Sequence, residues 1–219
     1  MHSPTQLEIY RNHYGTDMAR IDRLPPGIAR DRMAGDDAQE KRARCRKMLG
    51  LGDEEKLMLL IGSGFITKGL DRALDALAAL PEPLRARTQL IAIGTDQPRR
   101  FNARAQSLGV AERFRILSGR DDIPDFLQAA DLLVHPAYFE NTGNVLLEAI
   151  VAGLPVVTTD VCGFAHYVTD AQAGCVIPSP FEQARLNATV ADMLVSPERE
   201  TWRANGIAFG RVADIYSLP

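Results

Sequence analysis

The stretch His135-Pro-Ala-Tyr-Phe-Glu140-Asn-Thr-Gly-Asn-Val-Leu-Leu-Glu148-Ala-Ile-Val-Ala-Gly-Leu-Pro-Val-Val-Thr-Thr159 decides how the rest of the chain is interpreted. An apolar run at 131–134 predicts a buried strand, a polar turn with Gly143 follows, and an apolar-periodic helix then ends at Gly153-Leu-Pro155. In a parallel sheet such a turn lies at the carboxyl ends of the strands, where a helix start offers free backbone N–H groups to an anion. We expect residues 141–144 at that place.

Two carboxylates frame the start of this helix, Glu140 before it and Glu148 inside it. Their separation is roughly 12 Å at about 1.5 Å per helical residue, which is too far to share one reacting atom but suits one ligand held at two places. A nucleotide sugar has that shape, since its hexose and its ribose both offer hydroxyl pairs to a carboxylate. If only the two carboxylates are considered, the stronger interpretation is structural: Glu140 is a solvated loop residue, and Glu148 interacts favourably with the helix dipole.

The whole stretch changes that weighting, because it resembles the E-x7-E signature of the retaining, GT-B-fold glycosyltransferases of family four. The run that follows, Val161-Cys-Gly-Phe-Ala-His-Tyr167, is similar to the lipopolysaccharide core glucosyltransferase I branch of that family. The resemblance implies that Glu140 and Lys68 take part in catalysis. It implies a nucleotide-sugar site made of Gly62, Ser63, Lys68, Arg120, Glu140, Thr142, Gly143, Asn144, Val145 and Glu148.

A second glycine-containing loop, Gly62-Ser-Gly-Phe-Ile-Thr-Lys68-Gly69, follows the first predicted strand. Its spacing fits neither the Walker nor the dinucleotide fingerprint. A lysine at a helix start is unfavourable for the helix, so an anionic partner for Lys68 is indicated, although a lysine extended into water is the alternative. In the resembled family this loop reads Gly-Arg-x4-Lys-Gly, with both basic residues on the diphosphate. Ser63 replaces that arginine, which leaves Lys68 as the main cation of the loop.

Two more loops, at 94–98 and 118–121, fall on the same predicted rim. The resemblance places the base of the nucleotide at the second loop, with Arg120 beside it. We expect Arg120 to contact the nucleotide; the alternative is a surface ion pair with Asp121 or Asp122. His166 touches the sugar or lines the core, and we leave it out of the site because a histidine beside an aromatic residue is more often structural.

The order of the predicted elements indicates an α/β fold, a Rossmann-like doubly wound parallel sheet. Strands are predicted at 57–61, 89–93, 114–117, 131–135, 156–159 and 175–177, and helices at 70–80, 99–108, 123–130 and after Gly143. Residues 31–55 predict a solvated covering helix that packs through Ala43, Met48 and Leu49.

The first 30 residues differ from the rest, with a possible amphipathic helix at 4–20 and then the extended connection Leu24-Pro-Pro-Gly-Ile28. By resemblance, residues 1–30 are the end of an N-terminal domain and the interdomain crossover, and residues 31–219 are the C-terminal nucleotide-sugar-binding domain of a GT-B enzyme. A free N-terminal arm is the alternative. We therefore expect this chain to be half of the enzyme and inactive alone.

Composition excludes several other classes of function. The 219 residues are 46% hydrophobic and 24% charged, as in an ordinary globular protein, and a net charge of -3 argues against nucleic acid as a partner. Cys45, Cys162 and Cys175 have no disulfide or zinc spacing, and the four histidines form no metal motif. We expect reduced cysteines, no metal and no cofactor. The absence of a long apolar run or signal pattern favours the cytoplasm.

Two hypotheses follow from these patterns. The first is the donor-binding half of a retaining transferase that adds glucose from UDP-glucose to the heptose of lipopolysaccharide core. The acceptor and any peripheral contact with the inner face of the bacterial inner membrane would then involve the other half. The second is a nucleotide-sugar-binding domain without turnover, and a family-four transferase with another donor sugar is the closest enzymatic alternative.

Overall fold

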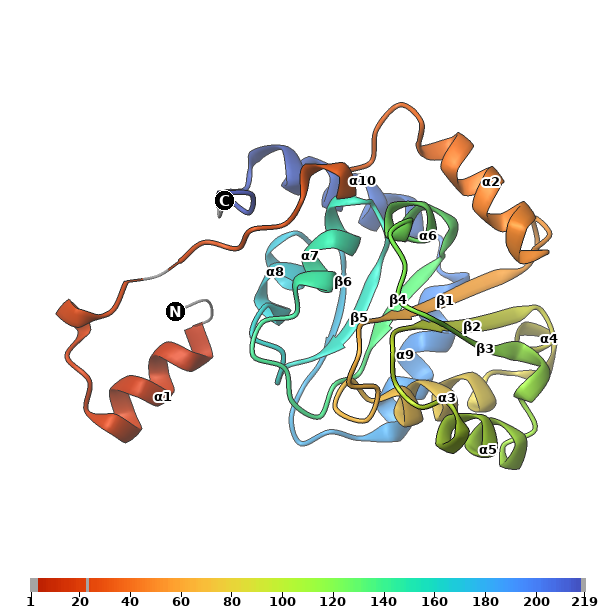
Figure 1. Ribbon diagram of the computed structural model, residues 1–219, viewed down its shortest axis with the longest axis horizontal. Coiled ribbons are helices and arrows are strands. Elements are labelled where there is room, and N and C mark those ends of the chain that lie inside the picture. The colour runs from red at the N-terminus through yellow and green to blue at the C-terminus, as the bar shows by residue number, and fades with distance from the viewer. Residues whose placement is uncertain (1–3, 23, 218–219) are drawn as a thin grey trace.

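The computed structural model describes residues 4–22 and 24–217, and its centre is a six-stranded parallel sheet in the order β3-β2-β1-β4-β5-β6 (Figure 1). The strands are β1 (Lys56–Ile61), β2 (Thr88–Ile93), β3 (Phe114–Leu117), β4 (Leu132–His135), β5 (Val156–Thr159) and β6 (Gly174–Ile177). The chain runs outward from β1 to β3 and then crosses back to β4 on the other side of β1. The sheet therefore has its topological switch point between β1 and β4, where open α/β sheets bind ligands.

Helices cover both faces of this sheet. One face carries α3 (Leu70–Ala79), α5 (Arg99–Ser107) and α9 (Gln183–Val195), and the other carries α2 (Ala38–Leu49), α6 (Ile123–Ala129), α7 (Asn144–Val151) and α8 (Ala165–Asp170). The short α4 (Glu82–Arg85) precedes β2, and α10 (Arg199–Val212) packs against α7. Alternate residues of β1 enter the two cores, with Leu57 and Leu59 on the α7 face and Met58 and Leu60 on the α3 face. This period of two is typical of a strand buried on both sides.

The predicted fold class is confirmed, and each predicted strand is present with its ends shifted by at most one residue. Two helix predictions need correction. The first helix, α1 (Pro4–Tyr14), ends before Gly15, and a separate 3-10 turn, η1 (Met18–Arg20), follows it. In α2, Ala43 and Met48 are exposed, because the face toward α6 consists of Cys45, Arg46 and Leu49. Helices α4, α8, α9 and α10 lie outside the predicted set.

The segment before α2 is extended, as its paired prolines predict, and α1 lies apart from the body of the protein (Figure 1). Gly27 pairs with Tyr216 in an antiparallel bridge, and the N–H of Ile28 donates to the carbonyl of Ile215 at 3.0 Å. Two further 3-10 turns, η2 (Arg30–Arg32) and η3 (Ala111–Arg113), complete the described elements. The proposed domain boundary at residue 30 stays a prediction.

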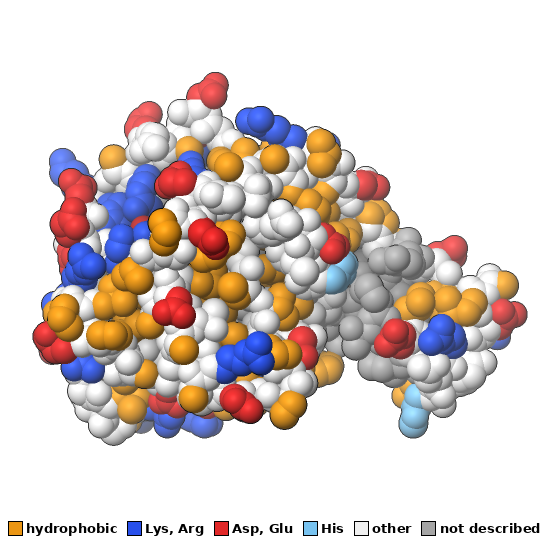
Figure 2. All heavy atoms as spheres, turned by 180° about the vertical axis from the view of Figure 1, so that it is seen from behind, with side chains coloured by type: hydrophobic (Ala, Val, Ile, Leu, Met, Phe, Trp, Pro, Cys, Tyr) orange, Lys and Arg blue, Asp and Glu red, His pale blue; other side chains and the backbone are white. Residues whose placement is uncertain are grey.

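Charged side chains of both signs are interspersed on the face shown in Figure 2, and the described residues there form no broad basic surface. Within residues 4–22 and 24–217, every helix is too short or too polar to cross a membrane. The three cysteines are free; Cys45 and Cys162 are buried and Cys175 is half-buried.

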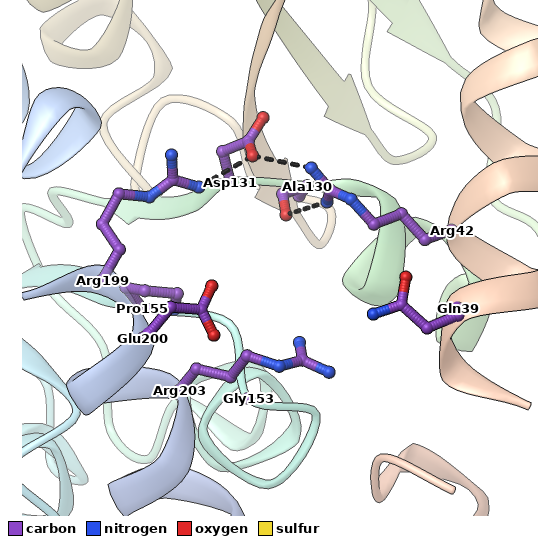
Figure 3. A pocket seen from close by; sticks show the side chains of 9 residues that line it. All are labelled: Gln39, Arg42, Ala130, Asp131, Gly153, Pro155, Arg199, Glu200 and Arg203. Atoms are coloured by element: carbon purple, nitrogen blue, oxygen red, sulfur yellow. Dashed lines mark hydrogen bonds and ion pairs between the residues drawn. The ribbon is translucent and has the colours of Figure 1, made fainter. Parts of the chain in front are cut away.

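A buried carboxylate, Asp131, joins several elements at the amino end of β4 (Figure 3). Its Oδ1 accepts hydrogen bonds from Arg42 of α2 at 2.9 Å and from Arg199 of α10 at 2.8 Å. Its Oδ2 accepts from the N–H of Leu57 in β1 at 2.8 Å and from Arg46 at 3.3 Å. A cavity of about 160 Å³ adjoins this cluster, at the end of the sheet opposite the β1 and β4 loops that begin at Gly62 and Pro136.

Asp131→Asn is expected to lower the free energy of unfolding by about 3 to 5 kcal/mol, the range for removing one partner of a buried ion pair. Burial opposes ionisation, but Arg42, the N–H of Leu57 and Arg199 outweigh it and hold the pKa of Asp131 below its usual value. A lowered pKa stabilises the fold above the unfolded value of about 3.9, and this contribution disappears as the pH falls through the folded value. Urea unfolding at several pH values measures both effects.

The matched control is Asp75→Asn, which removes a surface ion pair with Arg104 at 2.5 Å. Exposed pairs contribute about 0 to 1 kcal/mol, so this variant should unfold close to wild type. Equal destabilisation by the two substitutions would show that the buried Asp131 cluster contributes no more to the free energy of unfolding than a surface ion pair does.

Candidate functional site

The candidate site lies where the loops after β1 and β4 meet, on either side of the topological switch point. The N–H of Tyr138 donates to the carbonyl of Thr67 at 2.8 Å and joins the two loops. Gly69, the residue before α3, has a left-handed φ of 75°, and a Cβ there would lie 2.1 Å from the carbonyl oxygen of Pro136. The loops can approach this closely only because residue 69 is glycine.

Lys68 and Glu140 form an ion pair inside this junction. The Nζ atom of Lys68 lies 2.5 Å from Oε2 of Glu140, and each side chain is 17% exposed. The lysine side chain passes over Gly62, where a Cβ would lie 2.8 Å from its Cε atom. The sequence predicts an anionic partner for Lys68, and in the structure Lys68 pairs with a carboxylate of the same chain, Glu140. Both glycines therefore leave room that a side chain would fill: Gly62 for the side chain of Lys68, and Gly69 for the backbone of Pro136.

His135 is a third member of this cluster that the sequence analysis does not place in the site. Its ring is fully buried, and Nε2 lies 3.6 Å from Oε2 of Glu140. Burial lowers the pKa of His135 and keeps the ring neutral. Contact with His135 and the charge of Lys68 lower the pKa of Glu140 to about 2, although burial acts in the opposite direction. The sequence did hold one signal for His135, its position: a polar residue that ends a buried strand at this rim faces the site.

Glu148 lies in the second turn of α7 and is 20% exposed. Arg32, from the 3-10 turn η2, places its Nε atom 3.5 Å from Oε1 of Glu148. Burial raises the pKa of Glu148 despite the nearby charge of Arg32. Arg32 also lies outside the predicted site, because nothing in its local sequence connects it with a residue so far along the chain.

The start of α7 lies between the two glutamates. Gly143 precedes the helix with a φ of 94°, and no side chain caps the helix start. Asn144 is exposed, and Thr142 and Val145 are half-buried. The first N–H groups of a helix have no partner within it, so this end provides donors and a partial positive charge. The carbonyl of Thr142 accepts from the N–H of Phe164 at 2.8 Å, which fixes the approach to the helix.

The other predicted site residues are engaged with their neighbours. The hydroxyls of Ser63 and Thr95 are 2.8 Å apart and join the loops after β1 and β2. Arg120 binds both carboxylate oxygens of Asp122, at 2.5 and 2.8 Å, and its guanidinium lies 4.5 Å from the ring centre of Phe126. The structure thus shows the ion pair that was the alternative for Arg120, and its nucleotide contact stays a prediction.

His166 is half-buried in α8, where Nδ1 lies 3.1 Å from the carbonyl oxygen of Gly163 and the ring packs on Tyr167. Its omission from the site stays a prediction. Among the described residues, no group of three or more histidines, cysteines or carboxylates is placed to hold a metal ion. The polar centre of the candidate site consists of Lys68, Glu140 and His135, which lie close together, and the start of α7 lies beside them.

A doubly wound parallel sheet with a polar cluster at its switch point is the arrangement in which Rossmann-like domains bind ligands. Residues 41–209 match the family model Glycosyl transferases group 1, and the chain belongs to that family. The lipopolysaccharide glucosyltransferase WaaG of Escherichia coli (strain K12) is 46% identical over 215 residues, which cover 98% of this chain and 58% of WaaG.

A crystal structure of WaaG superposes on the chain with a TM-score of 0.96 and 45% identity, covering 100% of this chain and 60% of that one. The lipopolysaccharide core biosynthesis mannosyltransferase LpsB of Rhizobium meliloti (strain 1021) is 32% identical over 175 residues, 76% of this chain and 50% of LpsB. The chain thus spans between half and three fifths of the length of these relatives.

Lys68→Met is expected to raise the pKa of Glu140 from about 2, because the substitution removes the ammonium group that stabilises the charged carboxylate. Titration of the side-chain carboxyl by carbon-13 NMR measures the change. Lys41→Met is the matched control, since Lys41 pairs with Asp37 at 2.9 Å on the surface of α2. An unchanged titration of Glu140 in Lys68→Met would rule out the ion pair in solution.

Proposed function

We propose that the chain is the donor-binding half of a retaining glycosyltransferase of family four that moves glucose from UDP-glucose to the heptose of lipopolysaccharide core. The observation that carries the proposal is the meeting of Lys68, Glu140 and the uncapped start of α7 at the switch point, with Glu148 one turn further along the helix. Similarity to WaaG supports glucose and lipopolysaccharide, as that protein's name states both. LpsB is named a mannosyltransferase, so the donor hexose is the part that most needs an experiment.

In this proposal the diphosphate of the donor binds the first N–H groups of α7 and the ammonium of Lys68. As the bond between the sugar and the diphosphate breaks, negative charge grows on the leaving oxygen, and these preorganised donors stabilise it. Glu140 accepts hydrogen bonds from sugar hydroxyls and opposes the positive charge that develops at the anomeric carbon. Departure and attack on the same face give retention, so Glu140 need not form a covalent bond. Glu148 accepts hydrogen bonds from the ribose hydroxyls.

The proposal requires no metal and no cofactor, because Lys68 and the helix start supply the positive charge for the diphosphate. The acceptor would bind a second domain across the cleft. We therefore expect no transfer by residues 1–219 alone. We also propose that the full-length protein is cytoplasmic and touches the inner face of the bacterial inner membrane peripherally, through its acceptor-binding half.

The isolated chain is expected to bind UDP and UDP-glucose in the presence of a chelator, which calorimetry measures directly. Binding that needs added magnesium or manganese would contradict the metal-free site. The transfer step is tested with the full-length protein, deep-rough lipopolysaccharide and a panel of radiolabelled donors, where UDP-glucose is expected to give the highest rate. A higher rate with another sugar would correct the donor and keep the class of reaction.

Glu148→Ala is expected to weaken UDP binding by about 1.5 to 3 kcal/mol, the range for hydrogen bonds to a charged group. A 2',3'-dideoxy analogue should bind wild type and variant almost equally, because it lacks the hydroxyls that Glu148 accepts from. Glu200→Ala, an exposed glutamate on α10, is the control and should bind UDP like wild type. If the variant discriminates between UDP and the analogue as strongly as wild type does, Glu148 has no role at the ribose.

A further inference from the structure

His135 is a fully buried side chain whose hydrogen-bonding capacity is unmet. It is the last residue of β4, and neither ring nitrogen has a hydrogen-bond partner among the described residues. Buried polar groups in proteins are nearly always paired, because leaving one unpaired costs stability. An unpaired imidazole that faces a ligand site therefore indicates a partner that it acquires in another state of the protein.

The backbone around His135 is anchored, so its ring has a fixed place. Its carbonyl oxygen accepts from the hydroxyl of Thr158 at 3.0 Å and from the N–H of Ala137 at 2.9 Å. The loop that follows is tied to the turn between β5 and α8, since the carbonyl of Glu140 accepts from the N–H of Gly163 at 3.0 Å. The free movements in this cluster are therefore those of the Lys68 and Glu140 side chains.

One oxygen of Glu140 lies between two potential donors. Its Oε2 is 2.5 Å from Nζ of Lys68, within hydrogen-bond distance, and 3.6 Å from Nε2 of His135, just beyond it. A carboxylate only accepts, and a neutral imidazole has one N–H, so the favoured tautomer carries its proton on Nε2. Another titratable group near the carboxylate is the thiol of Cys162, whose pKa is raised mainly by burial and in part by Glu140.

We propose that His135 is the positioning residue that holds Glu140 when the donor draws Lys68 away. The inference rests on the proposed function, in which Lys68 binds the diphosphate. The ammonium that neutralises Glu140 in the unliganded chain then faces two phosphates, and its flexible four-carbon stem allows that movement. A carboxylate that is only 17% exposed is left without its cation. A small rotation of Glu140 brings Oε2 within hydrogen-bond distance of His135 Nε2.

This exchange of partners gives each residue a defined task. Before the donor binds, the Lys68–Glu140 ion pair neutralises both side chains. After donor binding, His135, whose contact already lowers the pKa of Glu140, keeps the carboxylate ionised and directed at the sugar hydroxyls. An uncharged hydrogen-bond donor such as the neutral imidazole of His135 suits this task, because a second cation would oppose the positive charge that develops on the sugar.

The test compares His135→Leu, His135→Gln and Glu140→Gln in the full-length protein. His135→Leu is expected to lower kcat about tenfold or more with a smaller change in KM for UDP-glucose, since a displacement of about 1 Å can cost a hundredfold in rate. Its acid limb of kcat should move to higher pH, because losing the hydrogen bond raises the pKa of Glu140. His135→Gln should recover most of kcat through its amide N–H. Glu200→Ala, an exposed glutamate on α10 at the opposite end of the sheet, is the control and should keep wild-type kcat.

A measurement on the wild-type chain covers the case in which His135→Leu does not fold. Nitrogen-15 NMR should show the Nε2–H tautomer, and its proton should shift downfield with UDP-glucose as the new hydrogen bond forms. A ring that does not respond to UDP-glucose would overturn the inference. Likewise, wild-type kcat and pH profile in His135→Leu beside a strongly impaired Glu140→Gln would overturn it while leaving the proposed function intact. Full activity of Glu140→Gln, or no binding of any nucleotide sugar, would instead overturn the proposed function.

Discussion

Asp131 pairs with three arginines, Arg42, Arg46 and Arg199, and this buried cluster holds the amino end of β4 against two helices and β1. Asp131 is 3% exposed and lies directly before β4. Its carboxylate connects α2, α10 and β1 to the amino end of that strand. A buried charge is tolerated only when it is paired and hydrogen-bonded, so all these elements must be in place together. Because β4 has only four residues, fixing its amino end also fixes His135 at its carboxyl end. A cluster that contains no site residue thereby positions the site at the other end of the strand.

The site itself depends on close backbone approach. Gly69 lies against the carbonyl of Pro136, and Gly62 leaves room for the side chain of Lys68 to reach Glu140. The resulting ion pair is short and mostly enclosed, and it holds together two loops that belong to neighbouring strands. Glu140 is the anion that pairs with Lys68 in the structure. In the proposed reaction the diphosphate competes with Glu140 for this ammonium group, which would couple donor binding to the pairing of the carboxylate.

Ser63 shows how the chain departs from the family pattern that it resembles. Where that pattern has an arginine, the serine hydroxyl joins Thr95 at 2.8 Å and links the loops after β1 and β2. The N–H of Gly64 donates to Asp96 at 2.7 Å and reinforces the same link. Ser63 thus gives this rim a link between two loops where the family pattern has a cation. In the proposed reaction, Lys68 and the start of α7 carry the whole charge of the diphosphate.

The α/β class, the six strands and the loop at Gly143 can be predicted from the sequence, because hydrophobic period and turn residues act over a few neighbours in the chain. The sequence also indicates that Lys68 needs an anionic partner. The identity of that partner follows from the folding of the chain, since Lys68 and Glu140 are 72 residues apart. The same holds for Arg32 beside Glu148, for Arg42 and Asp131, 89 residues apart, and for the unpaired ring of His135. These contacts follow from the order of strands in the sheet and the close approach of two loops, and local periodicity carries no information about either.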